Sequence, residues 1–181
     1  MATTTVSSPA QERRGAVTFK GNPLTLIGPE LKAGSKAPDF EGLAQDLSPV
    51  TLAGLRGKTV LISVTPSLDT PVCDLQAKRF NEEAARLPGV RILNVSMDLP
   101  FAQKRWCGAA GVERLTTVSD HREASFGTAY GTLIKELRLL ARAVFVLDAG
   151  GTVQYAEYVP EMTAHPNYDA ALAAVRQLAN K

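Results

Sequence analysis

The sequence contains little that would point to nucleic acid, a membrane or a metal ion. Its 20 basic and 18 acidic residues leave a formal charge of +2, too small for a strongly basic surface that binds nucleic acid or anionic lipid. Its apolar runs are all shorter than a bilayer-spanning helix requires. The few cysteines and histidines (Cys73, Cys107, His121, His165) are spaced unlike any common zinc motif. We therefore expect no nucleic acid, no membrane, no metal and no bound cofactor.

Cysteine is too scarce to stabilise the fold through disulfides. The chain has two cysteines in 181 residues, and the Cys-x-x-Cys pair that is typical of general dithiol oxidoreductases is absent. The N-terminal segment MATTTVSSPAQERRG lacks the apolar stretch of a signal peptide. We therefore expect a cytoplasmic protein with a disordered tail over residues 1–15 and one domain over residues 16–181.

Short β-rich runs and amphipathic stretches alternate along the rest of the chain. The run VTFKGNPLTLI, residues 17–27, is typical of a hairpin around a Gly-Asn-Pro turn. The run TVLISV, residues 59–64, is apolar on both faces and predicts a central strand that is covered on both sides. The other expected elements are an irregular strand near 40–47, a helix over 70–87, a strand over 90–96, a short helix from Pro100, a strand at TTVSD, a helix over 121–130, a hairpin around 149–151 and a helix from Tyr168.

This order of elements predicts an α/β fold of the thioredoxin-like type, with a mixed central sheet and an N-terminal β-hairpin. The competing arrangement is a doubly wound nucleotide-binding fold. That fold needs a glycine-rich turn directly after a strand, and none of the predicted strands is followed by one.

The stretch TPSLDTPVC, residues 65–73, forms the start of the helix expected over 70–87. Thr70 is a good N-cap, and Pro71 falls at the first helical position, where its missing N–H costs nothing. Cys73 is then the third helical residue. Unpaired N–H groups and the positive end of the helix dipole favour a negative group there, so we expect Cys73 to ionise readily. Thr70 lies in the previous turn and can offer its hydroxyl to the sulfur.

Cys73 also begins an apolar stripe along the same helix. The stripe continues at three- and four-residue steps through Ala77, Phe80, Ala84 and Leu87. A cysteine in such a stripe can be simple core packing. The sequence pattern leaves both interpretations open.

Cys107 lies near the end of the short helix, beside Gly108 and close to Gly111, where a helix frays easily. It can pair transiently with Cys73 after local unfolding, or remain an isolated buried thiol. A third interpretation is a cysteine hydrolase in which His121 or His165 acts as the base. Both histidines lie in ordinary surface settings.

The segment PSLDTPVC resembles the Pro-x-x-x-Thr-x-x-Cys signature of peroxiredoxins, placed on Pro66, Thr70 and Cys73. The segments SMDLPFAQKRWCGAAG and LLARAVFVLD are similar to the thiol peroxidase branch, also called atypical two-cysteine peroxiredoxins. The segments FKGNPLTLIG and HPNYDAALAAV resemble the two ends of that branch. The resemblance covers nearly everything from Val17 onward.

The resemblance implies a peroxidase that reduces hydrogen peroxide and organic hydroperoxides. It implies that Cys73 is oxidised to a sulfenic acid, that Cys107 resolves it in an intrachain disulfide, and that thioredoxin reduces this disulfide. Arg142 matches the family's active-site arginine, a choice that spacing alone could not make over Arg138 or Arg105. Thr70 and Arg142 would donate hydrogen bonds to the peroxide, and Pro66 would shield the sulfur from water. The branch usually forms homodimers.

Two residues depart from the family pattern. Pro71 replaces a more usual glycine, which should stiffen the first helical turn. Thr65 replaces a common aromatic residue, so we expect one wall of the pocket to be smaller and more polar. A non-enzymatic thiol switch on the same fold remains the alternative function.

Overall fold

The apolar run at residues 59–64 forms β5 (Thr59–Val64), an interior strand of a seven-stranded mixed sheet. The fold is taken from a computed structural model, which describes residues 10–179. The strands lie in the order β10-β9-β5-β6-β7-β3-β4. On one side of β5, β6 (Val90–Ser96) and β7 (Thr116–Ser119) continue the sheet in parallel. On the other side, β9 (Ala143–Leu147) pairs antiparallel with β5.

The edges of the sheet consist of antiparallel pairs. β10 (Val153–Tyr158) pairs with β9, and their hairpin turns at the glycine pair that the sequence predicts. At the opposite edge, β3 (Glu41–Leu43) pairs with both β4 (Pro49–Thr51) and β7. A short 3₁₀ helix, η1 (Ala53–Leu55), follows β4. The expected mixed sheet is therefore present.

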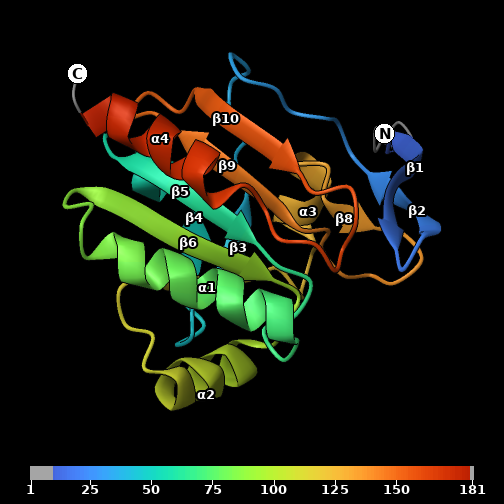
Figure 1. Ribbon diagram of the computed structural model, residues 1–181, viewed down its shortest axis with the longest axis horizontal. Coiled ribbons are helices and arrows are strands. Elements are labelled where there is room, and N and C mark those ends of the chain that lie inside the picture. The colour runs from blue at the N-terminus through green and yellow to red at the C-terminus, as the bar shows by residue number, and fades with distance from the viewer. Residues whose placement is uncertain (1–9, 180–181) are drawn as a thin grey trace, which may run out of the picture.

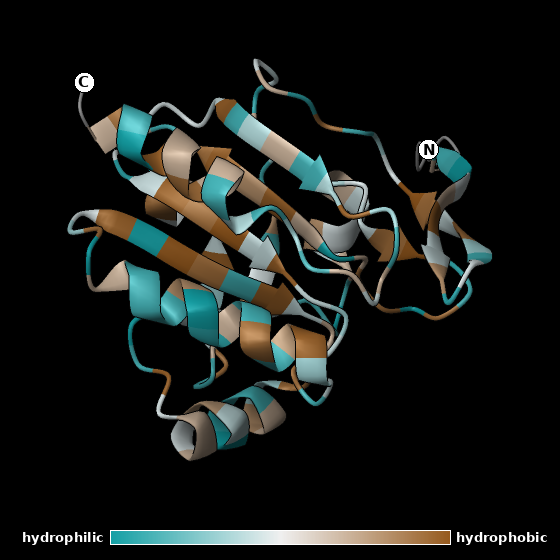
Figure 2. Cartoon of the chain, in the orientation of Figure 1, coloured by the Kyte–Doolittle hydropathy of each residue, from teal (hydrophilic) through white to brown (hydrophobic). Residues whose placement is uncertain are grey.

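Helices cover both faces of this sheet (Figure 1). Leu61 on β5 packs in a core with α1 (Pro71–Ala84) and α4 (Tyr168–Ala179). Its neighbours Val60 and Ile62 point to the other face and pack in a core with α3 (Ser125–Ala129). Figure 2 shows β5 and β6 as mostly hydrophobic and the outer side of α1 as hydrophilic. The double burial predicted for β5 is thus confirmed.

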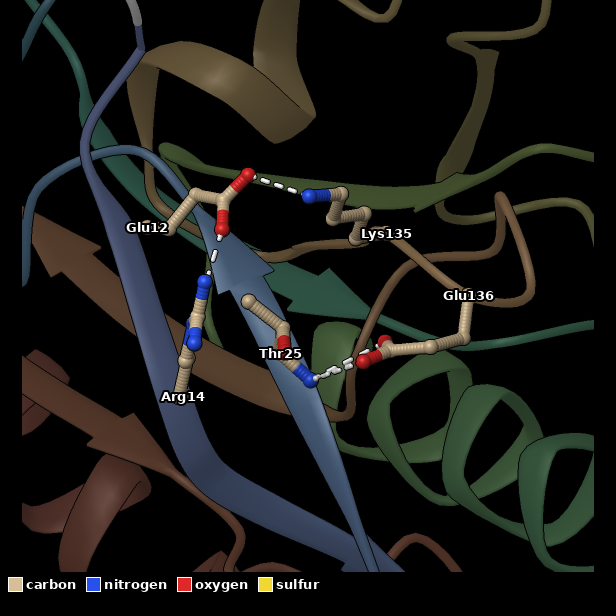
Figure 3. A network of polar contacts seen from close by, with 5 residues as sticks. All are labelled: Glu12, Arg14, Thr25, Lys135 and Glu136. Atoms are coloured by element: carbon tan, nitrogen blue, oxygen red, sulfur yellow. Dashed lines mark hydrogen bonds and ion pairs between the residues drawn. The ribbon is translucent and has the colours of Figure 1, made fainter.

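A second, smaller sheet stands at the end of the molecule where α1 begins (Figure 1). It contains the expected hairpin, β1 (Glu12–Phe19) and β2 (Asn22–Ile27), together with β8 (Leu133–Ile134). Glu12 pairs with Lys135, and the backbone N–H of Thr25 donates to the carboxylate of Glu136 (Figure 3). These contacts attach the hairpin to the segment that precedes β9.

Strand β1 begins earlier than the sequence indicated. Its residues 12–15 fall within the expected disordered tail, whereas residues 1–9 of that tail lie outside the described residues. The physical reason is Arg13, whose Nε donates to Gly28 O at 3.1 Å and whose Nη2 donates to Gly131 O at 2.5 Å. An irregular register between Arg13 and Val17 accommodates Gly15 at φ +65°.

Helix α3 is shorter than the expected helix over 121–130. Ala124 adopts a left-handed conformation at φ 50°, so the helix starts only at Ser125. Asp120 accepts hydrogen bonds from the N–H groups of Phe126 and Gly127 at 2.9 and 2.7 Å. The Asp120 carboxylate therefore caps the start of α3 from outside the helix. Helix propensity along the sequence did not indicate this contact. The strands β4 and β8 were also missed, because each is too short to show a period.

Candidate active site

Cys73 lies in the first turn of α1, as its sequence position predicts. Thr70 is the N-cap, with extended backbone angles (φ −107°, ψ 147°), and Pro71 is the first helical residue. The first helical hydrogen bond runs from Asp74 N to Thr70 O at 3.0 Å. The N–H of Cys73 therefore precedes the internal ladder of the helix. The Cys73 side chain is fully buried, yet it makes polar contacts that simple packing does not require.

The side chain of Thr70 points to the sulfur rather than to a helix N–H group. Its Oγ1 lies 2.7 Å from Cys73 Sγ and 3.0 Å from Ser67 O, and it makes no capping hydrogen bond. A hydroxyl carries one proton and can donate to only one of these two acceptors at a time. When the sulfur is an anion it is the stronger acceptor, so the geometry suits a Thr70 hydroxyl that donates to a thiolate.

Arg142 approaches the same sulfur from the other side. Its side chain is only 2% exposed, and its Nη2 lies 3.4 Å from Cys73 Sγ. Both Nε and Nη2 donate to Met162 O, and Nη1 donates to Gln76 Oε1 at 2.8 Å. Among the described residues no carboxylate forms an ion pair with it. The structure thus places a buried guanidinium without an acidic partner against the sulfur.

Gln76 holds Arg142 in this position, and the sequence analysis missed it. Its amide oxygen accepts from Arg142, while its Nε2 donates to Ser63 Oγ at 2.8 Å and to Val64 O at 3.3 Å. The side chain is fully buried and thereby links α1 to the end of β5. The available signal was its position three residues after Cys73, on the buried side of the same helix.

A pocket of about 200 Å³ opens at the start of α1, and most of its lining side chains are apolar. Cys73 itself does not line the pocket, but Thr70 and Arg142, which contact its sulfur, do. Pro66, Thr70 and Arg142 line it together with Phe19 from the hairpin and Leu137 from the loop after β8. The residues expected at the peroxide-facing wall are thus brought together. The fold places a hollow large enough for a small ligand directly over the start of α1.

Thr65 does not form a wall of this pocket, so the expectation of a smaller and more polar wall is wrong. The side chain is fully buried, and its Oγ1 accepts a hydrogen bond from Asn94 Nδ2 at 3.1 Å. Its N–H donates to Val95 O. Thr65 therefore belongs to a polar contact between the end of β5 and β6 and not to the pocket lining.

Cys107 has different surroundings from Cys73. It lies near the end of α2 (Pro100–Ala110), which stops at Gly111 in a left-handed conformation (φ 65°). Its Sγ accepts a hydrogen bond from Gln45 Nε2 at 3.3 Å, and the same amide donates to Thr117 Oγ1 at 2.9 Å. Burial raises the pKa of the Cys107 thiol, an effect that its contacts with Thr117 and Gln45 partly oppose. Both cysteines are free thiols in this structure.

Comparison with known proteins identifies the family of this chain. A family model described as Redoxin matches residues 32–172. The chain belongs to the redoxin family. This redoxin is similar to a protein named thiol peroxidase from Halalkalibacterium halodurans, at 62% identity over 161 residues, which cover 89% of this chain and 97% of the relative. A Bacillus subtilis protein of the same name is 57% identical over 162 residues, or 90% and 97% of the two chains.

Solved structures agree with the sequence relatives. The crystal structure of a peroxiredoxin-like protein from Aquifex aeolicus superposes with a TM-score of 0.85 at 45% identity, covering 91% of this redoxin and 97% of that chain. A thiol peroxidase from Chromobacterium violaceum superposes with a TM-score of 0.82 at 20% identity, which supports the fold alone. The thioredoxin-like fold and the thiol peroxidase branch that the sequence predicts are therefore confirmed.

Neither histidine of this redoxin contacts a cysteine in the described residues, where the buried Nδ1 of His121 has no hydrogen-bond partner. His165 Nδ1 lies 2.8 Å from the hydroxyl of Tyr168, and neither His121 nor His165 is a hydrogen-bond partner of a cysteine in the described chain. The geometry therefore gives the cysteine hydrolase no base. Between residues 10 and 179 there is no group of side chains suited to a metal ion and no helix long and apolar enough to span a membrane.

Asp98 fixes the loop that leads to α1. The sequence analysis did not identify this residue. Its carboxylate accepts from Ser67 Oγ and Leu68 N, both at 2.8 Å, and from Ser96 Oγ at 2.7 Å. Asp98 follows β6, so this contact joins two neighbouring strand ends. The motif SMDLP contains both Ser96 and Asp98, but Ser67 and Leu68 lie 31 and 30 positions before Asp98, beyond the range of any local pattern.

Proposed function

We propose that this protein is a thiol peroxidase in which Cys73 is the peroxidatic residue and Cys107 the resolving residue. One observation carries the proposal. The Cys73 sulfur lies at a helix start between the Thr70 hydroxyl and the buried Arg142, and both of these side chains line a pocket. The relatives named thiol peroxidase support thiol-dependent peroxide reduction, and with it a hydroperoxide substrate and a thiol reductant.

In the first step, the Cys73 thiolate attacks the terminal oxygen of the hydroperoxide and breaks the O–O bond. Cys73 becomes a sulfenic acid, and the departing alkoxide or hydroxide takes up a proton to leave as alcohol or water. Negative charge develops on the leaving oxygen, where donors are most effective. Arg142, the N–H of Cys73 and the Thr70 hydroxyl supply those donors, and Pro66 limits the access of water to the sulfur.

In the second step, the thiol of Cys107 attacks the sulfenic sulfur, releases water and forms the Cys73–Cys107 disulfide. An external dithiol then reduces this disulfide, and we propose thioredoxin for that role on the family resemblance. The cycle requires a compartment in which thiols are kept reduced, which supports the cytoplasm as its location. A homodimer is proposed on the same resemblance, and sedimentation velocity tests it.

A coupled assay separates this function from a thiol switch. Reduced protein is mixed with hydrogen peroxide, thioredoxin, thioredoxin reductase and NADPH, and absorbance at the NADPH band is followed. We expect many equivalents of NADPH to be consumed for each protein molecule. Oxidation of Cys73 without continued NADPH consumption would favour the switch and contradict the peroxidase.

Replacing the resolving cysteine tests the second step. The variant Cys107→Ser should reduce one equivalent of added peroxide but show no continued turnover with thioredoxin, because the sulfenic acid has no internal partner. Cys73→Ser should reduce none. Peroxide consumption per protein molecule measures both. If Cys107→Ser kept full steady-state turnover with thioredoxin, the resolving role of Cys107 would be ruled out.

A further inference from the structure

A hydrogen bond joins the immediate neighbours of the two cysteines. Trp106, the residue before Cys107, donates from its indole Nε1 to Oδ1 of Asp74, the residue after Cys73, at 3.0 Å. The chain has a single tryptophan. This contact connects the first turn of α1 to the second half of α2, the two segments that carry the reacting sulfur atoms.

The Asp74 carboxylate is held on both of its oxygens. Oδ2 forms an ion pair with Lys78 Nζ at 2.8 Å one turn later, while Oδ1 receives the indole. The main-chain N–H of Asp74 also closes the first turn on Thr70 O. A shallow pocket of about 270 Å³ is lined by Asp74, Trp106 and the loop before α1. The indole therefore lies next to the first turn of α1, which carries Cys73.

Both cysteines must leave their present partners to form a disulfide. Cys73 Sγ is held by Thr70 and Arg142, and Cys107 Sγ is held by Gln45. A disulfide requires Cα atoms about 4.4–6.8 Å apart with correctly directed Cβ atoms. Forming the disulfide replaces these sulfur contacts, so we expect the first turn of α1 or the end of α2 to open. Asp74 and Trp106 are next to the cysteines and move with these segments.

We propose that the Asp74–Trp106 hydrogen bond is a latch that holds α1 and α2 in the folded, peroxide-reactive arrangement and thereby sets the rate of disulfide formation. The inference rests on the proposed function. The chemistry remains that of the second step: the Cys107 thiol and the Cys73 sulfenic acid give a disulfide and water. Asp74 and Trp106 are positioning residues, because neither touches the substrate or a sulfur atom.

The latch has a cost when peroxide is abundant. While it is closed, the Cys73 sulfenic acid persists and a second peroxide can oxidise it to sulfinic acid, releasing alcohol or water. A weaker latch should shorten that interval. Disulfide formation and sulfinic acid formation therefore respond to the latch in opposite directions.

Three variants test the latch in the full chain. Trp106→Phe removes the donor and keeps an aromatic ring, Asp74→Ala removes the acceptor, and Asp74→Asn keeps an amide oxygen that can accept. Each reduced protein receives one equivalent of hydrogen peroxide, is quenched with a thiol-alkylating reagent, and is analysed by mass spectrometry over time. Lys78→Gln is the matched control, because it removes the ion pair but leaves the indole contact.

We expect Trp106→Phe and Asp74→Ala to accelerate disulfide formation about tenfold, since a hydrogen bond to a charged group is lost. Asp74→Asn should show a smaller increase, and Lys78→Gln none. The double variant Trp106→Phe/Asp74→Ala should be no faster than either single variant, because both remove the same contact. With excess peroxide, the sulfinic fraction per turnover should fall in the accelerated variants.

Unchanged or slower disulfide formation in both Trp106→Phe and Asp74→Ala would overturn the latch. Additive acceleration in the double variant would also overturn it, because the two side chains would then act independently. The unsubstituted protein separates this failure from that of the proposed function. If it forms no Cys73–Cys107 disulfide the function itself is wrong, whereas a normal disulfide with unresponsive variants removes the latch alone.

Discussion

At the scale of single residues, the site around the Cys73 sulfur depends on Arg142, a cation that the fold buries. Arg142 makes four hydrogen bonds with three partners, Met162 O, Gln76 Oε1 and Cys73 Sγ, and none of these is a carboxylate. The guanidinium is held in a fixed orientation by its planar fork. Its charge therefore acts on the sulfur and on any oxygen that enters the adjacent pocket.

Replacement of Arg142 by lysine tests the fork rather than the charge. Arg142→Lys retains a cation but loses simultaneous contact with Gln76 and the sulfur, so we expect the second-order rate of Cys73 oxidation to fall by about 10²-fold. Stopped-flow oxidation by hydrogen peroxide measures it. Arg138→Lys, on an exposed residue of the same loop, is the control and should keep the native rate. An equal rate for both variants would show that orientation of the donors is unimportant.

At the scale of secondary-structure elements, the N-terminal hairpin supplies one side of the pocket. Phe19 at the end of β1 lines it, and the hairpin turn is fixed by Glu161 from the loop after β10. The Glu161 carboxylate accepts from Thr18 Oγ1 at 2.6 Å and from the N–H groups of Lys20 and Gly21. Hydrogen bonds, that of Thr18 first, lower the pKa of Glu161 to about 2.

Neutralising Glu161 should loosen the hairpin turn. Because the folded pKa lies below the ordinary 4.5, the contribution of the carboxylate is complete above pH 4.5 and is lost as pH falls towards about 2. At neutral pH, Glu161→Gln should therefore speed amide hydrogen exchange at Lys20 and Gly21 several-fold. The exposed substitution Glu123→Gln should leave these amides unchanged. Equal exchange in the two variants would mean that the backbone pairing alone holds the turn.

At the scale of the whole molecule, an acidic group inside the fold makes stability depend on pH. The Asp120 side chain caps α3 between β7 and the aromatic core. Burial raises its pKa from 3.8 to about 6, although the N–H groups of Gly127 and Phe126 oppose the shift. The folded protein thus binds this proton more tightly than the unfolded chain does.

The sign of the effect on global stability follows from that difference. The stabilising contribution of protonated Asp120 is complete below pH 3.8 and is lost as pH rises through about 6. Asp120→Asn cannot titrate. The quantity to compare is the free energy of unfolding of the native protein minus that of Asp120→Asn. We expect this difference to fall by about 3 kcal/mol as the pH rises from 3.8 to above about 6. Urea unfolding at a series of pH values measures the difference, and a pH-independent difference would contradict a raised pKa.

The sequence predicted most of the elements that position the site. The double apolar pattern of β5 and the threonine–proline start of α1 are local signals, and both are confirmed. The boundaries of β1 and α3 were wrong, because Arg13 and Asp120 stabilise them through contacts with distant backbone groups. The hydrogen bond between the Thr65 side chain and Asn94 likewise could not be predicted from the pattern of residues around Thr65.

The sequence by itself determined that Cys73 occupies the third position of a helix, within a signature that names its family. Those features depend on residues a few positions apart and on the backbone geometry that they impose. The tertiary structure alone decided that Arg142, 69 positions away, reaches the sulfur, and that Trp106 meets Asp74. Such contacts arise where separate strands and helices pack together, and no periodicity along the chain records which side chains then meet.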